Sequence, residues 1–289
     1  MRVIRSIDEM RRACKGLHLS SPHQMLGLVP TMGALHQGHF SLVRTAKKNC
    51  GPVAASIFVN PTQFAPNEDY EQYPRSFQHD SDLLEREGVD LLFAPTAQEM
   101  YPAGEEAWVD VPNIGDRLDG LSRPGHFRAV ATVVAKLFNI IRPDKAFFGQ
   151  KDAAQVAVLR TMVRSLNFGV ELEVCPTVRD EDGLALSSRN RYLSSQERRE
   201  ALSLVQTLRH VEQAATQGEC SAPRLREILI ENLPTSNNFR LDYAEIVDPH
   251  TLAPVSWVGE GALVALAAWV GRTRLIDNVV IPQRRERTQ

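Results

Sequence analysis

Short apolar runs alternate with helical segments through much of this chain, and the alternation constrains the fold more than any other feature. Five runs have the length of buried strands, and we expect strands at 25–30, 53–59, 89–95, 145–149 and 170–176. Helices are expected between them, at 40–49, 77–88, 127–141 and 152–167. Strands that alternate with helices form a parallel sheet with crossover helices. The sequence therefore predicts an α/β fold with a Rossmann-like parallel sheet.

Two helices are expected to begin with a capping box, in which a serine and a glutamate three residues later each accept a hydrogen bond from the other's amide. Ser6 with Glu9 marks the first helix of the chain. Ser194 with Glu197 marks a long amphipathic helix at 194–218.

The pattern changes after the segment "DEDG" at 180–183. A shorter helix and two strands are expected beyond the long helix, at 222–232, 239–247 and 262–270. These elements indicate a separate α+β unit. We therefore expect a parallel-sheet domain at 1–179 and a smaller α+β C-terminal domain at 180–289.

Composition excludes several classes of protein. The 289 residues carry a formal net charge of −2 and a pI near 6.5, so the chain lacks the basic field typical of nucleic-acid or membrane-surface binding. Four cysteines lie far apart with no C-x-x-C pair, which indicates reduced, mostly buried thiols. Neither a secretory h-region nor an apolar stretch of about 18 residues occurs. We expect a cytoplasmic protein without nucleic-acid or membrane partners, and a solvated basic tail at 284–288.

The stretch "VPTMGALHQGH" at 29–39 places two histidines directly after an expected strand. Gly33 and Gly38 allow a tight turn and a helix begins at His39, so free amides and the positive end of the helix dipole form an anion site. His36 and His39 would add donors toward phosphate oxygens. They could also share a metal or be structural, although no H-E-x-x-H motif or nearby third histidine or cysteine completes a zinc site. These residues alone leave the phosphate, metal and structural interpretations open.

Two further polar segments stand out. In 147–155, Lys151 and Asp152 open a helix and Gln155 lies one turn beyond Lys151, so the lysine and the glutamine can face one cleft. The lysine suits a triphosphate, and an aspartate cap beside a solvated lysine is the simpler alternative. The segment "LSSRN" at 186–190 carries hydroxyls and a guanidinium that can close over phosphates, or forms a polar hinge. Ligands of parallel sheets bind outside the carboxyl ends of the strands, where the unusual residues fall.

Together these segments resemble one family. "PTMGALHQGHFSL" is similar to the HIGH-type nucleotide motif of nucleotidylyltransferases and class I aminoacyl-tRNA synthetases, and in full it resembles the pantothenate synthetase (pantoate–β-alanine ligase) family. Other signatures of that family follow in the same order: "SIFVNPTQF", "YPRS", "PGHF", "TVVAKLFNIIRPDKAFFGQKD" and "LSSRN". The resemblance covers nearly all of the first domain and the connecting segment. The C-terminal part matches mainly in length and around "LDYAEIVDP".

The resemblance implies a two-step ligation with ATP as co-substrate and Mg²⁺ as cofactor. The pantoate carboxylate would attack the α-phosphorus of ATP, giving pantoyl adenylate and pyrophosphate. The amine of β-alanine would then attack the adenylate, giving pantothenate and AMP. Since the substrates supply both nucleophiles, the protein would align them, stabilise charge and exclude water. A homodimer is also implied. The magnesium ligands stay unknown: Asp80 is a candidate near the metal, and a solvated helix carboxylate is the favoured interpretation.

The resemblance assigns an ATP site position by position, to Met32, Gly33, Ala34, Leu35, His36, Gln37, Gly38, His39, Gly149, Gln150, Lys151, Asp152, Val178, Leu186, Ser187, Ser188 and Arg189. The catalytic group among them would be His39, His36, Lys151, Ser187, Ser188 and Arg189. His36 and His39 would stabilise the triphosphate, with His39 donating to the departing phosphate. Lys151 would bind the phosphates, which the last four residues would cover. Asp152 would lie on the ribose and Val178 on the adenine.

The resemblance also assigns a pantoate site. Gln63 and Gln155 would hold the hydroxyl and carboxylate groups of pantoate, with Gln63 also near β-alanine, because an amide both donates and accepts hydrogen bonds. The chain departs from the family at three places. Leu186 stands where methionine is usual, Ala129 where glycine is common, and Ala154 where the family has the first of two glutamines. These departures concern fine contacts and not the reaction.

Other functions fit parts of the pattern. A different HIGH-type adenylating enzyme shares the histidine motif, although a tRNA-using one should carry a larger or more basic anticodon module. A non-catalytic nucleotide-binding module would explain the glycines at the strand ends, but not Gln63, Gln155 and "LSSRN" together. A dehydrogenase is disfavoured because no G-x-G-x-x-G follows the first strand.

Overall fold

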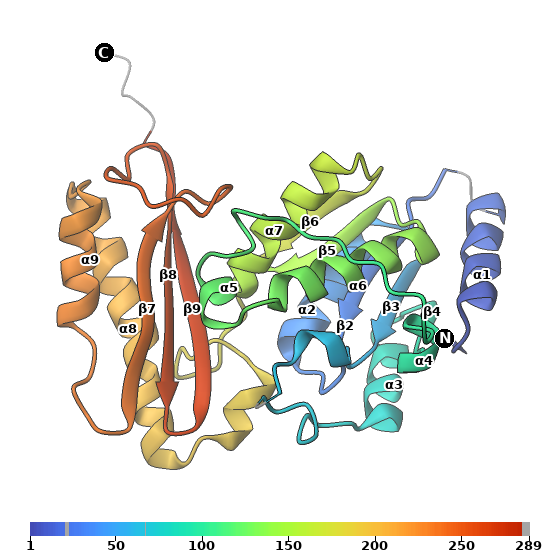
Figure 1. The fold of residues 1–289 in the computed structure, drawn as a ribbon, viewed down its shortest axis with the longest axis horizontal. Helices are drawn as coiled ribbons and strands as arrows, with labels where there is room; N and C mark the ends of the chain where they lie inside the picture. Colours follow the sequence, from blue (N-terminus) through green and yellow to red (C-terminus); the bar gives the residue numbers. More distant parts are fainter. Residues whose placement is uncertain (21–22, 67, 285–289) are drawn as a thin grey trace.

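The structure is a computed structural model that describes residues 1–20, 23–66 and 68–284. Its larger sheet has six parallel strands in the order β1-β4-β3-β2-β5-β6 (Figure 1). In chain order the strands are β1 (Arg2–Ile4), β2 (Gly27–Thr31), β3 (Val53–Ile57), β4 (Leu91–Phe93), β5 (Lys145–Gly149) and β6 (Glu171–Cys175). The predicted Rossmann-like α/β fold is confirmed. Residues 285–288 of the predicted basic tail lie outside the described residues.

Helices cover both faces of this sheet. Leu28 packs in one core with α1, α6 and α7, and Val29 packs in another with α2 and α3, because successive side chains of a strand point to opposite faces. The helices are α1 (Ile7–Ser20), α2 (Gln37–Asn49), α3 (Phe77–Arg86), α6 (His126–Ile141) and α7 (Ala153–Ser165). Shorter helices and 3₁₀ turns lie between them: η1 (Pro61–Gln63), α4 (Ala97–Met100), α5 (Asp119–Ser122) and η2 (Gln150–Asp152).

The strand order places the ends of β2 and β5 side by side. From β2 the chain builds the sheet outward through β3 and β4, and from β5 it builds in the opposite direction to β6. Such a reversal is the topological switch point, where ligands of open α/β sheets bind. The histidine segment follows β2 and the Lys151 segment follows β5, so the fold brings two of the three predicted site segments together.

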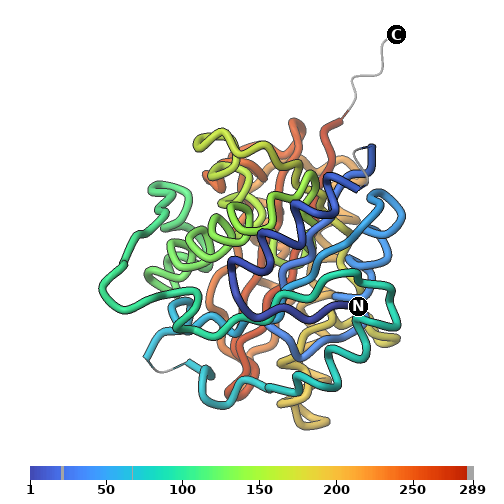
Figure 2. The backbone as a smooth tube through the Cα atoms, turned by 90° about the vertical axis from the view of Figure 1, so that its right-hand side faces the viewer, coloured from blue at the N-terminus to red at the C-terminus, as the bar shows by residue number. Residues whose placement is uncertain are grey.

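The C-terminal part forms an antiparallel three-stranded sheet with two long helices on one face (Figure 1). Its elements are η3 (Ser188–Tyr192), α8 (Ser195–Gln217), α9 (Ala222–Glu231), β7 (Phe239–Val247), β8 (Ala262–Val270) and β9 (Thr273–Ile281). The other face of the sheet joins the core around α6 through Leu263 and Ala265 of β8. Figure 2, seen from the α1 side, shows this sheet behind the parallel-sheet part.

Several local predictions can be compared directly. The capping box of Ser194 and Glu197 is confirmed. At Ser6 only half of the predicted box forms: the Ser6 hydroxyl accepts from the Glu9 amide at 3.4 Å, but the Glu9 carboxylate binds Arg2 at 2.6 Å instead.

All four cysteines are buried and free. Strands β1 and β9 were not predicted. Within the described ranges, no helix combines the length and the apolar character needed to cross a membrane.

Candidate active site

The turn after β2, residues 32–39, is built around two histidine rings and is called the histidine turn below. His36 is the N-cap of α2: its Nδ1 accepts from the Gly38 amide at 3.2 Å, and its own amide donates to Nδ1 of His39 at 3.3 Å. The ring centroids lie 4.1 Å apart. A Cβ added at Gly38 would lie 2.8 Å from Cε1 of His36, so the observed position of the His36 ring requires glycine at position 38. Because both Nδ1 atoms accept, each neutral ring carries its proton on Nε2, where it can be donated to a ligand.

Both rings are neutral at pH 7. Burial, with the Lys151 ammonium as a further cause, lowers the pKa of His36 to about 4. Burial, reinforced by His36 and then Lys151, lowers the pKa of His39 to about 3. Within residues 1–20, 23–66 and 68–284, no group of three or more histidine, cysteine or acidic side chains is arranged to hold a metal. The geometry is that of two neutral hydrogen-bond donors beside a lysine.

Asp80 on α3 holds this histidine turn in place. Asp80 is 2% exposed, and its two carboxylate oxygens accept from the amides of Ala34 at 2.8 Å and Leu35 at 3.0 Å. Gly33 and Ala34 have left-handed φ angles of 85° and 51°. The prediction of a solvated helix carboxylate is therefore wrong, because the fold buries Asp80 against a turn 46 residues away.

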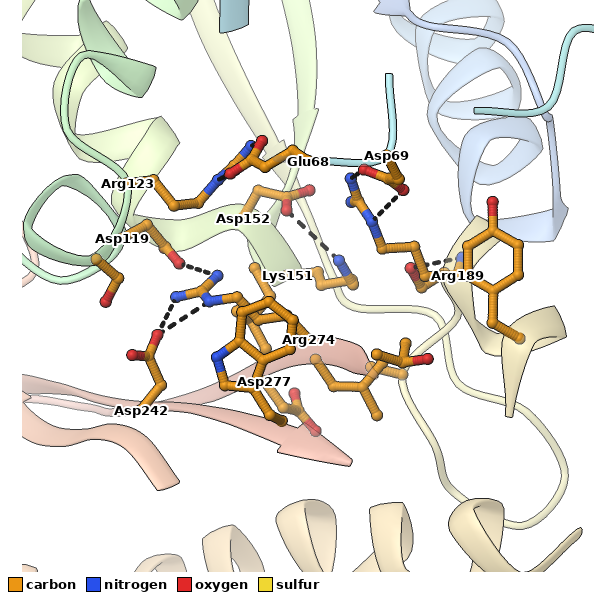
Figure 3. Close-up of a pocket in the computed structure, with 18 of the residues that line it drawn as sticks. Glu68, Asp69, Asp119, Arg123, Lys151, Asp152, Arg189, Asp242, Arg274 and Asp277 are labelled. Atoms are coloured by element: carbon orange, nitrogen blue, oxygen red, sulfur yellow. Dashed lines mark hydrogen bonds and ion pairs between the residues drawn. The ribbon is translucent and has the colours of Figure 1, made fainter. Parts of the chain in front are cut away.

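The Lys151 segment borders a cavity of about 800 Å³ between the two sheets (Figure 3). Lys151, Asp152 and Gln155 all line it, as expected for residues facing one cleft. The lysine Nζ lies 3.5 Å from the Asp152 carboxylate, and its side chain is 21% exposed. Asp152 is the N-cap residue of α7 but makes no capping hydrogen bond with its side chain. The alternative of an aspartate cap beside a solvated lysine is therefore not observed.

A third segment closes over the histidine turn. The Leu186 amide donates to the Val178 carbonyl at 3.0 Å, which brings these two predicted ATP-site residues together. The Leu186 side chain also approaches the histidine turn, with its Cβ 4.0 Å from the Cβ position of Gly38. The predicted neighbourhood of residues 32–39 and the "LSSRN" segment thus exists in the fold.

The polar groups of this segment have protein partners. The Ser187 hydroxyl accepts from the Arg189 amide at 3.2 Å. The Arg189 guanidinium binds Asp69 through two hydrogen bonds of 2.9 and 3.1 Å. Ser187 and Arg189 line the cavity (Figure 3 labels Arg189). Arg189 would therefore have to exchange Asp69 for a phosphate.

Gln63 is not among the described residues that line the cavity, but it contacts the histidine turn. Its Nε2 lies 2.9 Å from the Met32 sulfur, and its Oε1 accepts from Asn60 at 3.2 Å. Its carbonyl accepts from Nδ1 of His126, a cavity-lining residue, at 3.0 Å. Gln155 lines the cavity itself. The structure thus places Gln155 on the cavity wall and Gln63 next to the histidine turn, with a hydrogen bond to the cavity-lining His126.

The far wall of the cavity comes from the C-terminal sheet, and the sequence did not predict that residues of this sheet line the site. Arg274 on β9 pairs with Asp119 at 2.7 Å and with Asp242 at 2.7 Å, with all three side chains largely buried (Figure 3). Asp277 of the same strand also lines the cavity. The sequence offered no signal for these residues, because β9 itself was not predicted and their partners are far along the chain.

The fold and the site define a class: an α/β nucleotide-binding enzyme in which a neutral histidine pair and a lysine meet at the switch point of a parallel sheet. Comparison with known proteins identifies the family. The family model described as pantoate-beta-alanine ligase matches residues 2–280. The chain belongs to the pantoate–β-alanine ligase family.

Individual relatives match over nearly their whole length. The chain is 54% identical to a pantothenate synthetase of Acidobacterium capsulatum, over 97% of each chain. A crystal structure of pantothenate synthetase from Thermus thermophilus is similar with a TM-score of 0.90 and 46% identity, covering 96% of this chain and 99% of that one. Pantoate-beta-alanine ligase from Francisella tularensis, complexed with beta-gamma ATP and beta-alanine, is similar with a TM-score of 0.79 and 34% identity, covering 97% of each.

Proposed function

We propose that this chain, which ligates pantoate to β-alanine with ATP, does so at the described site through a pantoyl adenylate and releases AMP and pyrophosphate. Family membership supports the ligation with ATP. The observation that carries the residue assignment is that the histidine turn and the Lys151 segment follow the neighbouring strands β2 and β5 at the switch point of the sheet. The relative crystallised with beta-gamma ATP and beta-alanine supports the same substrates here.

In the first step, a pantoate carboxylate oxygen forms a bond to the α-phosphorus, and the bond from that phosphorus to the bridging oxygen of the β-phosphate breaks. Pyrophosphate leaves with the electron pair. The Nε2–H groups of His39 and His36 would donate to phosphate oxygens, His39 to the departing group. Lys151 would add a fixed positive charge, and the first amides of α2 would add oriented dipoles.

In the second step, the nitrogen of β-alanine bonds to the acyl carbon, the bond from that carbon to the AMP oxygen breaks, and the amine loses a proton. AMP leaves with the electron pair. Gln63 and Gln155 would orient the pantoate groups during both steps, since neutral amides donate and accept without neutralising the carboxylate. Val178 would contact the adenine and Asp152 the ribose.

The C-terminal unit would complete and cover the site. We take 1–179 and 180–289 as the two domains, with Leu186, Ser187, Ser188 and Arg189 at their junction. The close approach of the Leu186 side chain to the histidine turn supports a covering role for this segment. Excluding water would protect the acyl adenylate from hydrolysis.

Magnesium would enter with the nucleotide. Both oxygens of Asp80 are engaged by backbone amides, so that carboxylate is not available as a ligand. Asp152, beside Lys151 on the cavity wall, is assigned to the ribose, so the protein supplies few ligands beside the phosphates. This sparse set fits Mg²⁺, which keeps several waters and is held mainly by substrate phosphates. The ion would neutralise phosphate charge.

We further propose a cytoplasmic homodimer, as the family resemblance implies. Light scattering of the purified chain would test the dimer, since a monomeric mass would contradict it.

The function is tested by measuring AMP formation from ATP, pantoate and β-alanine, which should depend on both acids. His39→Asn keeps an acceptor for the His36 amide but loses the Nε2–H donor, so AMP formation should fall by about 10²-fold or more. His210→Ala, at an exposed position of α8, is the matched control and should keep full activity. A non-catalytic nucleotide-binding module would instead form no AMP in any variant.

A further inference from the structure

The segment that carries Lys151 is held by an asparagine of the C-terminal sheet. Asn278 on β9 is 6% exposed. Its Nδ2 donates to the carbonyls of Gln150 at 3.0 Å and Lys151 at 2.9 Å, and its Oδ1 accepts from Nε2 of Gln150 at 2.9 Å. Both donors and the oxygen of this amide are therefore used on one short turn, 128 residues away in sequence.

The preceding residue holds a second segment of the site. Asp277 is 3% exposed, and its carboxylate accepts from the Arg179 guanidinium at 2.6 and 3.0 Å. Arg179 also donates to the Gly183 carbonyl at 3.2 Å, which fixes the turn between Val178 and Leu186. Asp277 thus anchors the segment that approaches the histidine turn.

The two anchors are fixed relative to each other. The Asn278 amide donates to the Asp277 carboxylate at 2.8 Å, and both residues belong to the same strand. We infer that Asp277 and Asn278 are positioning residues for ATP, which set the distance between Lys151 and the 178–189 segment. This inference rests on the proposed function. The C-terminal sheet thereby builds the nucleotide site in addition to covering it.

Misplacement of a binding group by about 1 Å can reduce activity by about 10²-fold. Substitutions at Asp277 or Asn278 should therefore weaken ATP binding strongly. Substitution of a residue that only stabilises the fold would weaken the binding of all substrates alike. The two roles are separable because β-alanine binding is assigned to Gln63, which has no contact with Asn278 among the hydrogen bonds described above.

Asn278→Asp tests the inference with a nearly isosteric change. The new oxygen would face the two carbonyls of Gln150 and Lys151, while the acceptor for the Gln150 side chain is kept. Calorimetry without pantoate should give an ATP Kd weaker by about ten-fold or more, with a KM for ATP raised in parallel. The KM for β-alanine should stay within about two-fold. Asn237→Asp, at an exposed position of the same domain, makes the same chemical change and should leave all values unchanged.

Arg179→Lys gives a second, milder test if the first variant does not fold. The lysine keeps a charge beside Asp277 but loses the paired hydrogen bonds, so ATP binding should weaken by about three-fold. Thermal midpoints of each variant would be recorded alongside.

Wild-type ATP affinity in both variants would overturn the inference. An equal loss of affinity for every substrate, in proportion to the fall in thermal midpoint, would also overturn it. Failure of the proposed function would look different. Wild type and Asn237→Asp would then form no AMP, while the calorimetric comparison of ATP affinities would still test Asp277 and Asn278.

Discussion

Asp80 accepts a hydrogen bond from the Ala34 amide at 2.8 Å, which joins α3 to the turn in front of α2. The second carboxylate oxygen accepts from the Leu35 amide at 3.0 Å. Ala34 has a left-handed φ of 51°, a conformation that costs a residue with a side chain about 1–3 kcal/mol. The carboxylate offsets that strain, so the position of the histidine pair depends on a residue that contacts neither ring among the described hydrogen bonds.

Asp80→Asn should slow pantoate-dependent exchange of pyrophosphate into ATP by about ten-fold or more, because displaced donors lose much of their effect. The asparagine offers one oxygen where the turn needs two, and its NH₂ faces an amide donor, which should also cost about 1–3 kcal/mol of stability. Asp82→Asn is the control: Asp82 is exposed on the same helix and accepts from Gln78. Equal exchange rates for the two variants would contradict the assigned role.

The neutral histidines predict the pH dependence of the first step. The pKa of His36 is lowered to about 4 and that of His39 to about 3, so both rings stay neutral as the pH falls through 6.5. Protonation at lower pH would place a proton on each Nδ1, against the amides of Gly38 and His36 that now donate there. The acid limb of kcat/KM for ATP, measured by pyrophosphate exchange, should therefore lie below about pH 5. A limb centred near pH 6.5 that disappears in His39→Asn would contradict this account.

Arg274 joins the C-terminal sheet to the α5 segment of the parallel-sheet part, and this contact predicts a loss of stability on substitution. It pairs with Asp119 and Asp242, whose side chains are 10% and 16% exposed. Arg274→Ala leaves these carboxylates buried without their cation, so urea unfolding should show a loss of about 3–5 kcal/mol. Arg224→Ala breaks an exposed pair with Glu227 and should cost less than about 0.5 kcal/mol. Similar losses in the two variants would mean that the Arg274 cluster is not the buried attachment described.

The fold was predictable where the signal is local. The apolar runs ending near Pro30 and Gly149 have the length and composition of buried strands, and parallel connectivity then places their ends together. Strand β1 has only three residues and gave no periodic signal. Strand β9 pairs with β8 through a two-residue turn after Val270, in a run that mixes charged and apolar residues, so its pattern was not distinctive.

The sequence predicted the segments of the candidate site, but not the residues that hold those segments in place. His36, His39 and Lys151 lie in segments with a motif of their own, so the sequence alone was enough to propose them as candidates. Asp80 and Asn278 act through contacts 46 and 128 residues away, and nothing in their immediate sequence indicates those partners. Such residues become visible only when the fold brings the backbone amides and carbonyls that they serve within reach.

The central claim is that pantoate is activated as an adenylate, and labelled oxygen tests it most directly. Pantoate carrying ¹⁸O in its carboxylate would be turned over with ATP and β-alanine, and the nucleotide product analysed by mass spectrometry. Attack on the α-phosphorus predicts AMP that carries one ¹⁸O atom, because the carboxylate oxygen stays on phosphorus when the amide forms. Unlabelled AMP, or ADP with the label in inorganic phosphate, would contradict the account.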